Sequence, residues 1–288
     1  KGSFEAGYSA ASLRIEKEMK TKEKIPASVN VLGLSTVHMK GREDAEEIRR
    51  LLSLCGIRVI SMPGGGSNWD DIMAAPSASL NIVVRDELGL SLAKQMERDF
   101  GTPYMSSGLP YGTDGTMAWL SEIIEKLGAG ELIRASHEAA KLKEFLLRKG
   151  NNLESLWGPL WFDAVLISAP PSEALGIAEA IRSEWIDTAH LCIHAQCETE
   201  KSTPAADAIR VVMKNEKEIA KDYEDWQGGL VLSSSHETHL LRRMGRSFTG
   251  FHIALPSHDE VHFSDLPQCG LRGAGYLYEQ LWNAKLRR

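Results

Sequence analysis

The amino-acid sequence predicts an α/β protein made of two Rossmann-like, doubly wound parallel-sheet domains, each with three αβα layers. Three observations lead to this class. The chain has 288 residues, and about 150 residues per domain is a reasonable prior. Apolar residues make up 43% and charged residues 25%, which is typical of globular proteins with buried cores. Short apolar runs alternate with helical patterns through both halves, and this alternation indicates parallel strands joined by helical crossovers.

The first half starts with a modest helical pattern over residues 9–22, where Leu13, Ile15 and Met19 stand among charged residues. Short apolar runs with β-branched residues then predict strands over 28–34, 58–62 and 80–84. Helical stretches accompany these strands over 44–55, 69–74, 90–100 and 117–127. We therefore expect the first Rossmann-like domain to span 29–129.

A charged helical stretch over 130–149 separates the two halves, and Gly150, Asn151 and Asn152 after it are typical of a helix stop. It predicts a helical linker over 130–152. The alternation then resumes with strands predicted over 164–168, 190–194, 229–233 and 248–254. Helices are predicted between them over 172–185, 216–223 and 237–244. We expect a second Rossmann-like domain over 153–265, and a C-terminal loop and packing helix over 266–288.

The start of the chain suggests a piece of a longer protein, because Lys1 stands where a Met would begin translation. We interpret residues 1–28 as an N-terminal helix left from a missing first domain. The apolar face of residues 9–22 is then expected to be exposed, since its partner would lie in that domain.

Charge and composition exclude several classes of function. The formal net charge of -6 argues against non-specific nucleic-acid binding, which needs clustered Lys and Arg. No apolar run approaches the roughly 18 residues of a membrane span, and the first residues lack a signal-peptide core. The four cysteines form no CxxC pair, which excludes a zinc ribbon and a thioredoxin motif. These features predict a cytoplasmic protein without nucleic-acid or membrane partners.

Candidate site residues follow the predicted strands, because loops at the carboxyl ends of parallel strands build the binding crevice. These loops carry His38, Arg85, Ser172 and His236. The glycine-rich stretch after the second strand, residues 63–67, lacks the Lys-Ser/Thr of a P-loop and the GxGxxG spacing of a dinucleotide site. A flexible strand-to-helix turn explains it better.

Histidine and cysteine positions suggest possible metal ligands. His236 and His239 have i, i+3 spacing, as a metal pair would, but two histidines alone make a poor site, and solvated loop histidines are the alternative we favour. Further histidines at 252, 258 and 262 lie in a separate segment. Cys269 precedes the terminal helix in a glycine-flanked loop, where a thiolate could bind iron.

Several motifs in order resemble nitrogenase component 1 and its relatives. The resemblance begins at VNVLGL (29–34) and EEIRRLLSLCGIRV (46–59), and continues at LPYGTDGTMAWL (109–120). Near the end, GLVLSSSHETHLLRRMGRSF (229–248) and LPQCGLRGAGYLYEQLWN (266–283) resemble the family's closing segments. It covers nearly the whole chain, and it looks closer to β-type, cofactor-assembly or tetrapyrrole-reducing subunits than to catalytic α-subunits.

The resemblance implies three Rossmann-like domains with the cluster-binding cysteines mainly in the first, so an iron–sulfur cluster is expected in the full-length protein and none in this fragment. Catalytic α-subunits carry a cofactor-binding Cys where this sequence has Arg85 and a His where it has Cys269. Both departures argue against nitrogen reduction. Arg85 could instead face an anionic substrate or an acidic neighbour, or be a solvated loop residue.

The function that the resemblance implies is an oxidoreductase subunit that accepts electrons from an ATP-dependent iron–sulfur reductase protein. It would assemble with a homologous component 1 subunit, as a heterotetramer or a homodimer. A non-catalytic cofactor-assembly scaffold of the same fold is one alternative. A two-domain small-molecule-binding protein is another, and it rests on architecture alone.

Overall fold

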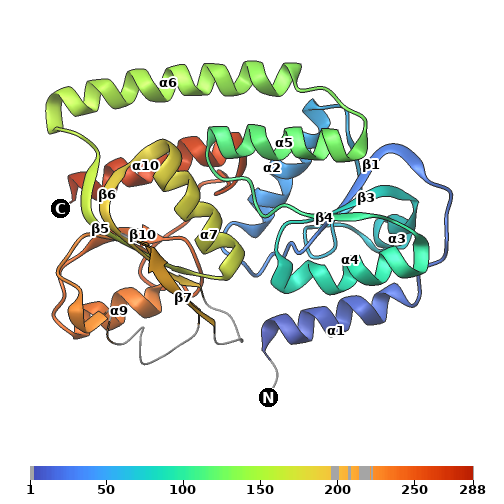
Figure 1. Cartoon of the computed structure of the whole chain (residues 1–288), viewed down its shortest axis with the longest axis horizontal. Helices are drawn as coiled ribbons and strands as arrows, with labels where there is room; N and C mark the ends of the chain where they lie inside the picture. The colour runs from blue at the N-terminus through green and yellow to red at the C-terminus, as the bar shows by residue number, and fades with distance from the viewer. Residues whose placement is uncertain (1–2, 196–200, 207–208, 214–220, 222, 288) are drawn as a thin grey trace.

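Two sheets lie side by side along the long axis of the molecule (Figure 1). The computed structural model describes residues 3–195, 201–206, 209–213, 221 and 223–287. Helices cover both faces of each sheet, which confirms the predicted α/β class with two Rossmann-like halves. Among the described residues, none of the helices combines the length and the apolar run that a bilayer crossing requires.

The first sheet has four parallel strands in the order β2-β1-β3-β4. These strands are β1 (Ile25–Leu32), β2 (Arg58–Ser61), β3 (Ala78–Val83) and β4 (Tyr104–Ser106). Alternate residues of β1 face opposite layers, so Val29 and Val31 pack under α2 (Gly41–Leu54) and α5 (Thr113–Leu127), whereas Leu32 packs under α4 (Asp86–Phe100). The short α3 (Trp69–Ala74) and a 3-10 turn (Ala75–Ser77) lead from β2 into β3.

The second sheet has six strands in the order β10-β9-β5-β6-β8-β7, and β7 alone runs antiparallel to its neighbour. Its strands are β5 (Trp161–Ala169), β6 (Asp187–Ala195), β7 (Lys201–Ala206), β8 (Ile209–Met213), β9 (Leu230–Ser233) and β10 (Thr249–His252). One face packs on α7 (Pro171–Ala180), which continues as a π-helical turn (Ile181–Trp185), and the other on α9 (Ser235–Arg243). The helix predicted over 216–223 lies mostly outside the described residues.

Two helices tie the halves together. The expected linker lies in α6 (Ile133–Trp157), which runs along both halves, and α10 (Gly270–Leu286) packs on α2, α5 and α6 as well as on β10 (Figure 1). The predicted stop at Gly150 is wrong, because the helix continues to Trp157. Gly150 serves close packing instead: a Cβ there would lie 2.3 Å from the hydroxyl of Tyr278 on α10.

The buried apolar side chains continue across the boundary between the halves. One hydrophobic cluster includes Leu109 and Tyr111 from the first half, Ile177 from the second, and Leu277 and Leu281 of α10. This continuity means that the two halves share a core, so they are held in one arrangement by burial as well as by chain connections.

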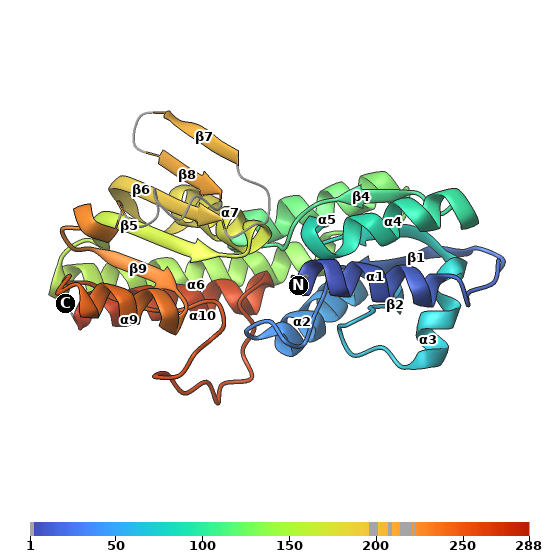
Figure 2. The ribbon, with the colours of Figure 1, turned by 90° about the horizontal axis from the view of Figure 1, so that it is seen from below.

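The N-terminal helix α1 (Phe4–Glu16) is displaced from the predicted 9–22, because Ser3 caps it by accepting a hydrogen bond from the Ala6 amide. It packs beside α4 (Figures 1 and 2). The exposure expected for the apolar face of residues 9–22 is wrong for Ile15 and Met19, which pack into the cluster around α4. Ala10 and Ala11 on the same segment are exposed.

Candidate functional site

Residues from the ends of three strands meet at the boundary between the two sheets. Arg85 follows β3, His38 follows β1, and Glu173 lies in the first turn of α7, directly after β5. Carboxyl ends of parallel strands build crevices in open α/β sheets. The sequence therefore brings residues from both halves to one place, which we call the boundary cluster: His38, Asp44, Arg85, Tyr111 and Glu173.

Arg85 is the centre of this cluster and is fully buried. Its Nε and Nη2 donate to Glu173 Oε1 at 3.0 and 2.6 Å, and its Nη1 donates to the Gly33 carbonyl at 3.3 Å. A buried guanidinium is tolerated only when it is paired in this way. Of the three expected environments for Arg85, an anionic substrate, an acidic neighbour or solvent, the structure shows the acidic neighbour.

Gly33 makes the close approach of Arg85 possible. Its φ of +91° lies in the region that favours glycine, and an added Cβ would stand 2.6 Å from the Arg85 carbonyl oxygen. A side chain at this position would push the backbone of residue 85 away from β1. The glycine therefore fixes how deeply Arg85 enters the boundary.

His38 adds a neutral imidazole to the cluster. Its Nδ1 lies 3.5 Å from Glu173 Oε1, and the side chain is 15% exposed. Burial lowers the pKa of His38 to about 4, and the positive charge of Arg85 acts in the same direction. Because Arg85 already neutralises Glu173, the imidazole is left uncharged at neutral pH.

Asp44 joins the cluster to the N-terminus of α10. Its Oδ1 accepts hydrogen bonds from the amides of Gln268 and Cys269, at 2.7 and 3.0 Å. A carboxylate at a helix N-terminus satisfies amides that have no partner within the helix and complements the helix dipole. Burial nevertheless raises the pKa of Asp44 to about 6, against the lowering effect of Arg85. This carboxyl group can therefore carry a proton close to neutral pH.

Unpaired polar atoms show that the cluster has room for further hydrogen bonds. Tyr111 Oη, Asp44 Oδ2 and Gln268 Nε2 are buried and have no hydrogen-bond partner among the described residues. Buried polar groups are nearly always paired with protein or ordered water. Burial, together with the negative charges of Glu173 and Asp44, raises the pKa of Tyr111 well above its ordinary value, so its hydroxyl remains a donor. The boundary cluster can thus offer protons to a water or a small polar ligand.

Ser172 lies at the same boundary as a second polar tie between α4 and α7. Its hydroxyl donates to Glu87 Oε2 at 2.6 Å. Burial raises the pKa of Glu87, and the Ser172 hydrogen bond partly offsets that effect. Of the predicted site residues, Arg85, His38 and Ser172 therefore lie at the boundary, and Cys269 is attached to it through Asp44.

His236 belongs to a different place. It lies in the first turn of α9, where Ser234 and Glu237 form a capping box. With His239 and His258 it lines a separate pocket of about 380 Å³ in the second half. The structure does not bring it into the boundary cluster.

The described cysteines do not form a ligand set for an iron–sulfur cluster, which needs several thiolates around one site. Cys55 ends α2, Cys192 lies in β6, and Cys269 precedes α10. No described group of three or more potential metal ligands includes any of them. Burial raises the pKa of Cys269 well above its ordinary value, and the charges of Asp44 and Glu47 add to that effect. These three thiols do not fit the cluster, and Cys197 lies outside the described residues.

Sequence reasoning missed the acidic partners of the boundary. Glu173 stands in SAPPSEA (168–174), where Ser172 is the only predicted site residue. Glu184 from the second half accepts hydrogen bonds from the amides of Thr113 and Asp114 at the start of α5, at 2.7 and 2.8 Å. An acidic residue in the first turn after a strand was an available signal for Glu173. No local signal identifies Glu184, because its partners are about 70 residues away in the sequence.

Comparisons with known proteins agree with this architecture. The chain is similar to a subunit of the light-independent protochlorophyllide reductase of Prosthecochloris aestuarii, at 25% identity over 89% of this chain and 51% of the relative. The corresponding protein of Chlorobium phaeobacteroides is 24% identical over 98% and 55% of the two chains. The chain thus spans about half the length of these curated relatives.

Comparison with solved structures identifies the fold of the chain, and a family model identifies its family. A structure of nitrogenase Cp1 at pH 6.5 superposes with a TM-score of 0.73 at 17% identity, over 99% of this chain and 66% of the other, which shows the shared fold. The model of the family "Nitrogenase component 1 type Oxidoreductase" matches residues 1–286. Because that match extends over nearly the entire sequence, the chain belongs to the nitrogenase component 1 type oxidoreductases.

Proposed function

We propose that the protein is an oxidoreductase subunit that accepts electrons from an ATP-dependent iron–sulfur reductase and acts beside a homologous component 1 subunit. Members of this family bind iron–sulfur clusters and work with a reductase component and partner subunits. The observation that carries the proposal is the boundary cluster, which stands at the carboxyl ends of β1, β3 and β5 in a chain that matches the family from residue 1 to 286.

The residues of the boundary cluster support a role in positioning and proton supply. The iron–sulfur chemistry would come from the rest of the assembly, since the described thiols do not gather. Reduction of a double bond consumes protons as well as electrons. Two groups of the boundary cluster could supply a proton: the Asp44 carboxyl group, with a pKa of about 6, and the Tyr111 hydroxyl. Asp44 Oδ2 and Tyr111 Oη have no hydrogen-bond partner among the described residues. Arg85 is paired with Glu173 and buried, so its role would be to hold the two halves in place around a substrate and not to contact the substrate.

A tetrapyrrole is the substrate class to test first. The curated relatives named above are protochlorophyllide reductase subunits. The names of these relatives are what favours a tetrapyrrole, since the charge of Arg85 is already paired with Glu173.

Nucleotide-dependent complex formation tests the proposal. The full-length protein would be mixed with an ATP-dependent iron–sulfur reductase from the same source, and the mass of the complex measured with MgATP, with MgADP and without nucleotide. We expect an association that depends on the nucleotide. The reductase mixed with an unrelated acidic α/β protein is the control. Absence of association in all three nucleotide states would contradict the proposal.

A non-catalytic assembly scaffold is the second candidate. The resemblance implies that Arg85 stands where catalytic α-subunits carry a cofactor-binding cysteine, and the pairing of Arg85 with Glu173 leaves no ligand at this position, which favours the scaffold. Reconstitution of the full-length protein with iron and sulfide separates the two functions. Stable cluster uptake with reductase-dependent reduction supports the electron-accepting subunit, whereas a protein that stays free of clusters supports the scaffold.

A further inference from the structure

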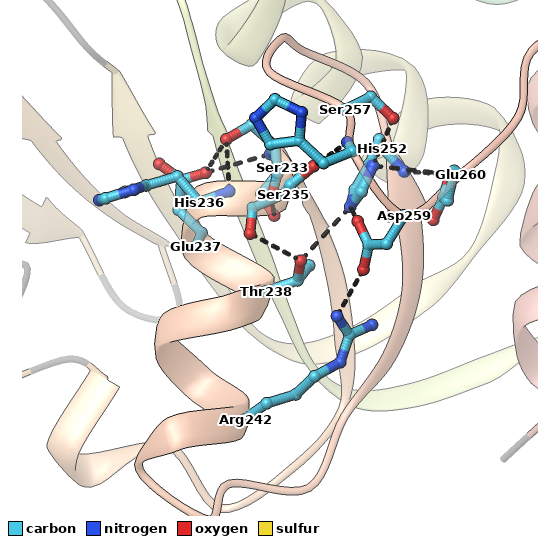
Figure 3. Close-up of polar contacts among 12 residues, drawn as sticks. Ser233, Ser235, His236, Glu237, Thr238, Arg242, His252, Ser257, Asp259 and Glu260 are labelled. Carbon is cyan, nitrogen blue, oxygen red and sulfur yellow. Dashed lines mark hydrogen bonds and ion pairs between the residues drawn. The ribbon is translucent and has the colours of Figure 1, made fainter.

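Three potential metal ligands meet at the carboxyl end of β10, away from the boundary cluster. Figure 3 shows two of them, His252 and Glu260, with Ser257 and Asp259 beside them. His252 is the last residue of β10, and Glu260 and His262 lie in the loop that follows. Glu260 Oε2 is 3.9 Å from His252 Nδ1 and 3.8 Å from His262 Nε2. All three ligand atoms lie within 4.8 Å of one another, and theirs is the only such trio among the described residues.

The contacts of His252 indicate which of its two ring nitrogens faces this group. Its Nε2 lies 3.4 Å from Asp259 Oδ1 and 3.3 Å from Thr238 Oγ1, and Arg242 holds the other Asp259 oxygen at 2.5 Å. Because a carboxylate accepts, Nε2 carries the proton and Nδ1 presents its lone pair to Glu260 and His262. A carboxylate behind the far nitrogen of a ligand histidine is the usual outer support of metal sites.

Glu260 and His262 also have polar contacts that hold them near His252. The His252 backbone amide donates to Glu260 Oε2 at 3.0 Å. Ser257 Oγ stands 2.8 Å from His252 Nδ1 and 3.0 Å from His262 Nε2. Without an ion, the hydroxyl donates to His252 Nδ1 and accepts from a proton on His262 Nε2, whereas a cation at this position would be bound by the lone pairs of both nitrogens. His262 and Glu260 are 22% and 29% exposed, so an ion can enter from solvent.

We propose that His252, Glu260 and His262 bind one divalent transition-metal ion, with Zn²⁺ as the representative. Two imidazoles and one carboxylate form a ligand set that zinc accepts at about 2.0–2.2 Å, with a fourth position left for water or the Ser257 hydroxyl. Ligand atoms of a tetrahedral zinc ion are about 3.4 Å apart at those bond lengths. The two distances from Glu260 therefore need to shorten by about half an ångström, and the two imidazole nitrogens, which lie within 4.8 Å of one another, need to reach the same separation.

The ion would fix the loop between β10 and α10 to the end of β10. This loop projects from the surface (Figure 2). Phe263 in this loop is 96% exposed and Val261 is 77% exposed. The backbone carbonyl of Ser264 accepts a hydrogen bond from Lys40 of the first half. A metal at residues 252, 260 and 262 would thus hold these exposed apolar side chains in one position. This inference does not depend on electron transfer.

Zinc titration of the full-length protein, freed of metal by a chelator, tests the site. Calorimetry should show one tight Zn²⁺ equivalent that is lost in His262→Ala and in Glu260→Gln. The matched control is His258→Ala, an exposed histidine of the same loop, which should bind as the parent does. Asp259→Asn should weaken binding by about 10–100-fold, because it removes the support behind His252. Circular dichroism verifies that each variant is folded.

Cobalt substitution distinguishes this site from binding through a thiol. The visible spectrum of the Co²⁺ form should show nitrogen and oxygen ligands, without thiolate-to-cobalt charge transfer, and should disappear in His262→Ala. A thiolate band that His262→Ala abolishes, or a spectrum with no contribution that His262→Ala removes, would overturn the proposal. So would the absence of stoichiometric Zn²⁺ binding, or binding that is unchanged in both His262→Ala and Glu260→Gln.

Discussion

Arg85 of the first half and Glu173 of the second half form a buried ion pair. Arg85 has no exposed surface, and the Glu173 side chain is 4% exposed. The attraction between them is strong in such surroundings, but each also loses its hydration, so the pair specifies the arrangement of the halves more than it adds net stability. Removing one partner alone is the costly change.

Glu173→Gln should therefore lower the free energy of unfolding by about 3–5 kcal/mol, because it leaves the Arg85 charge buried without a counter-charge. Urea unfolding at neutral pH measures this. Glu179→Gln on the same helix is the control: its side chain is 73% exposed, and the change should stay within about 0.5 kcal/mol. The double variant Arg85→Met, Glu173→Leu should recover much of the loss. Equal effects of the two single glutamine variants would contradict this account.

His38 and Asp44 should make opposite contributions to stability as pH changes. The pKa of His38 falls from 6.5 to about 4 on folding, so the unfolded chain binds more protons and this contribution is lost as pH falls through that range. The pKa of Asp44 rises from 3.8 to about 6, so the folded chain binds more protons and stability is gained as pH falls from about 6 to 4.

His38→Gln removes the first contribution and leaves the second. Between about pH 6.5 and 4.5 the variant should gain about 2 kcal/mol of unfolding free energy relative to the parent. Asp44→Asn should shift the difference in the opposite direction. Urea titrations across this pH range measure both, and parallel curves for the parent and His38→Gln would show that His38 is not held neutral by burial.

At the scale of elements, the N-termini of two helices are capped by carboxylates from other parts of the chain. Asp44 of α2 accepts from the amides at the start of α10, and Glu184 of the second half accepts from the amides at the start of α5. Neither helix has a side-chain cap of its own at the N-cap residue, which is Cys269 for α10 and Gly112 for α5. Tertiary contacts therefore supply what the local sequence lacks.

Glu184→Ala should cost about 1–2 kcal/mol, as the loss of a helix cap does. Amide hydrogen exchange at Thr113 and Asp114 should become about 5–30-fold faster, because local opening becomes easier by that free energy. Glu125→Ala, an exposed change further along α5, is the matched control and should leave both amides unchanged. Unaltered protection in Glu184→Ala would mean that solvent satisfies these amides equally well.

The difference between local sequence signals and tertiary contacts also explains which elements the sequence could predict. Apolar runs that are buried on both faces, such as 80–84, identify their strands directly, because composition and burial agree. β4 has three residues and β7 contains Pro204, so neither gives a strand pattern. The helix end expected after residue 149 is wrong, because the glycine at position 150 makes room for the side chain of Tyr278 and does not end the helix.

The candidate site was predictable to a similar degree. Loops after strands drew attention to His38, Arg85 and Ser172, which lie at the boundary because strand ends gather at one edge of a sheet. That they hold a cofactor stays a prediction. The choice of Glu173 as the partner of Arg85 depends on how the two halves dock, which no local pattern encodes. His252, Glu260 and His262 converge for the same kind of reason, because a strand end and a loop meet only after folding.

At the scale of the whole molecule, the hydrophobic cluster, α6 and α10 all cross the boundary between the halves. Residues that meet there are held in a fixed arrangement, which is what an electron-accepting subunit needs in order to position a substrate against its reductase partner. The family match over residues 1–286 and the boundary cluster are the two observations that support the function proposed above.

Rapid mixing with a reduced partner tests that central claim most directly. The reduced ATP-dependent iron–sulfur reductase would be mixed with the full-length protein and MgATP, and its iron–sulfur absorbance followed in time. The account predicts fast oxidation of the reductase that requires both the protein and hydrolysable ATP. Oxidation at the same slow rate whether or not the protein or ATP is present would contradict it.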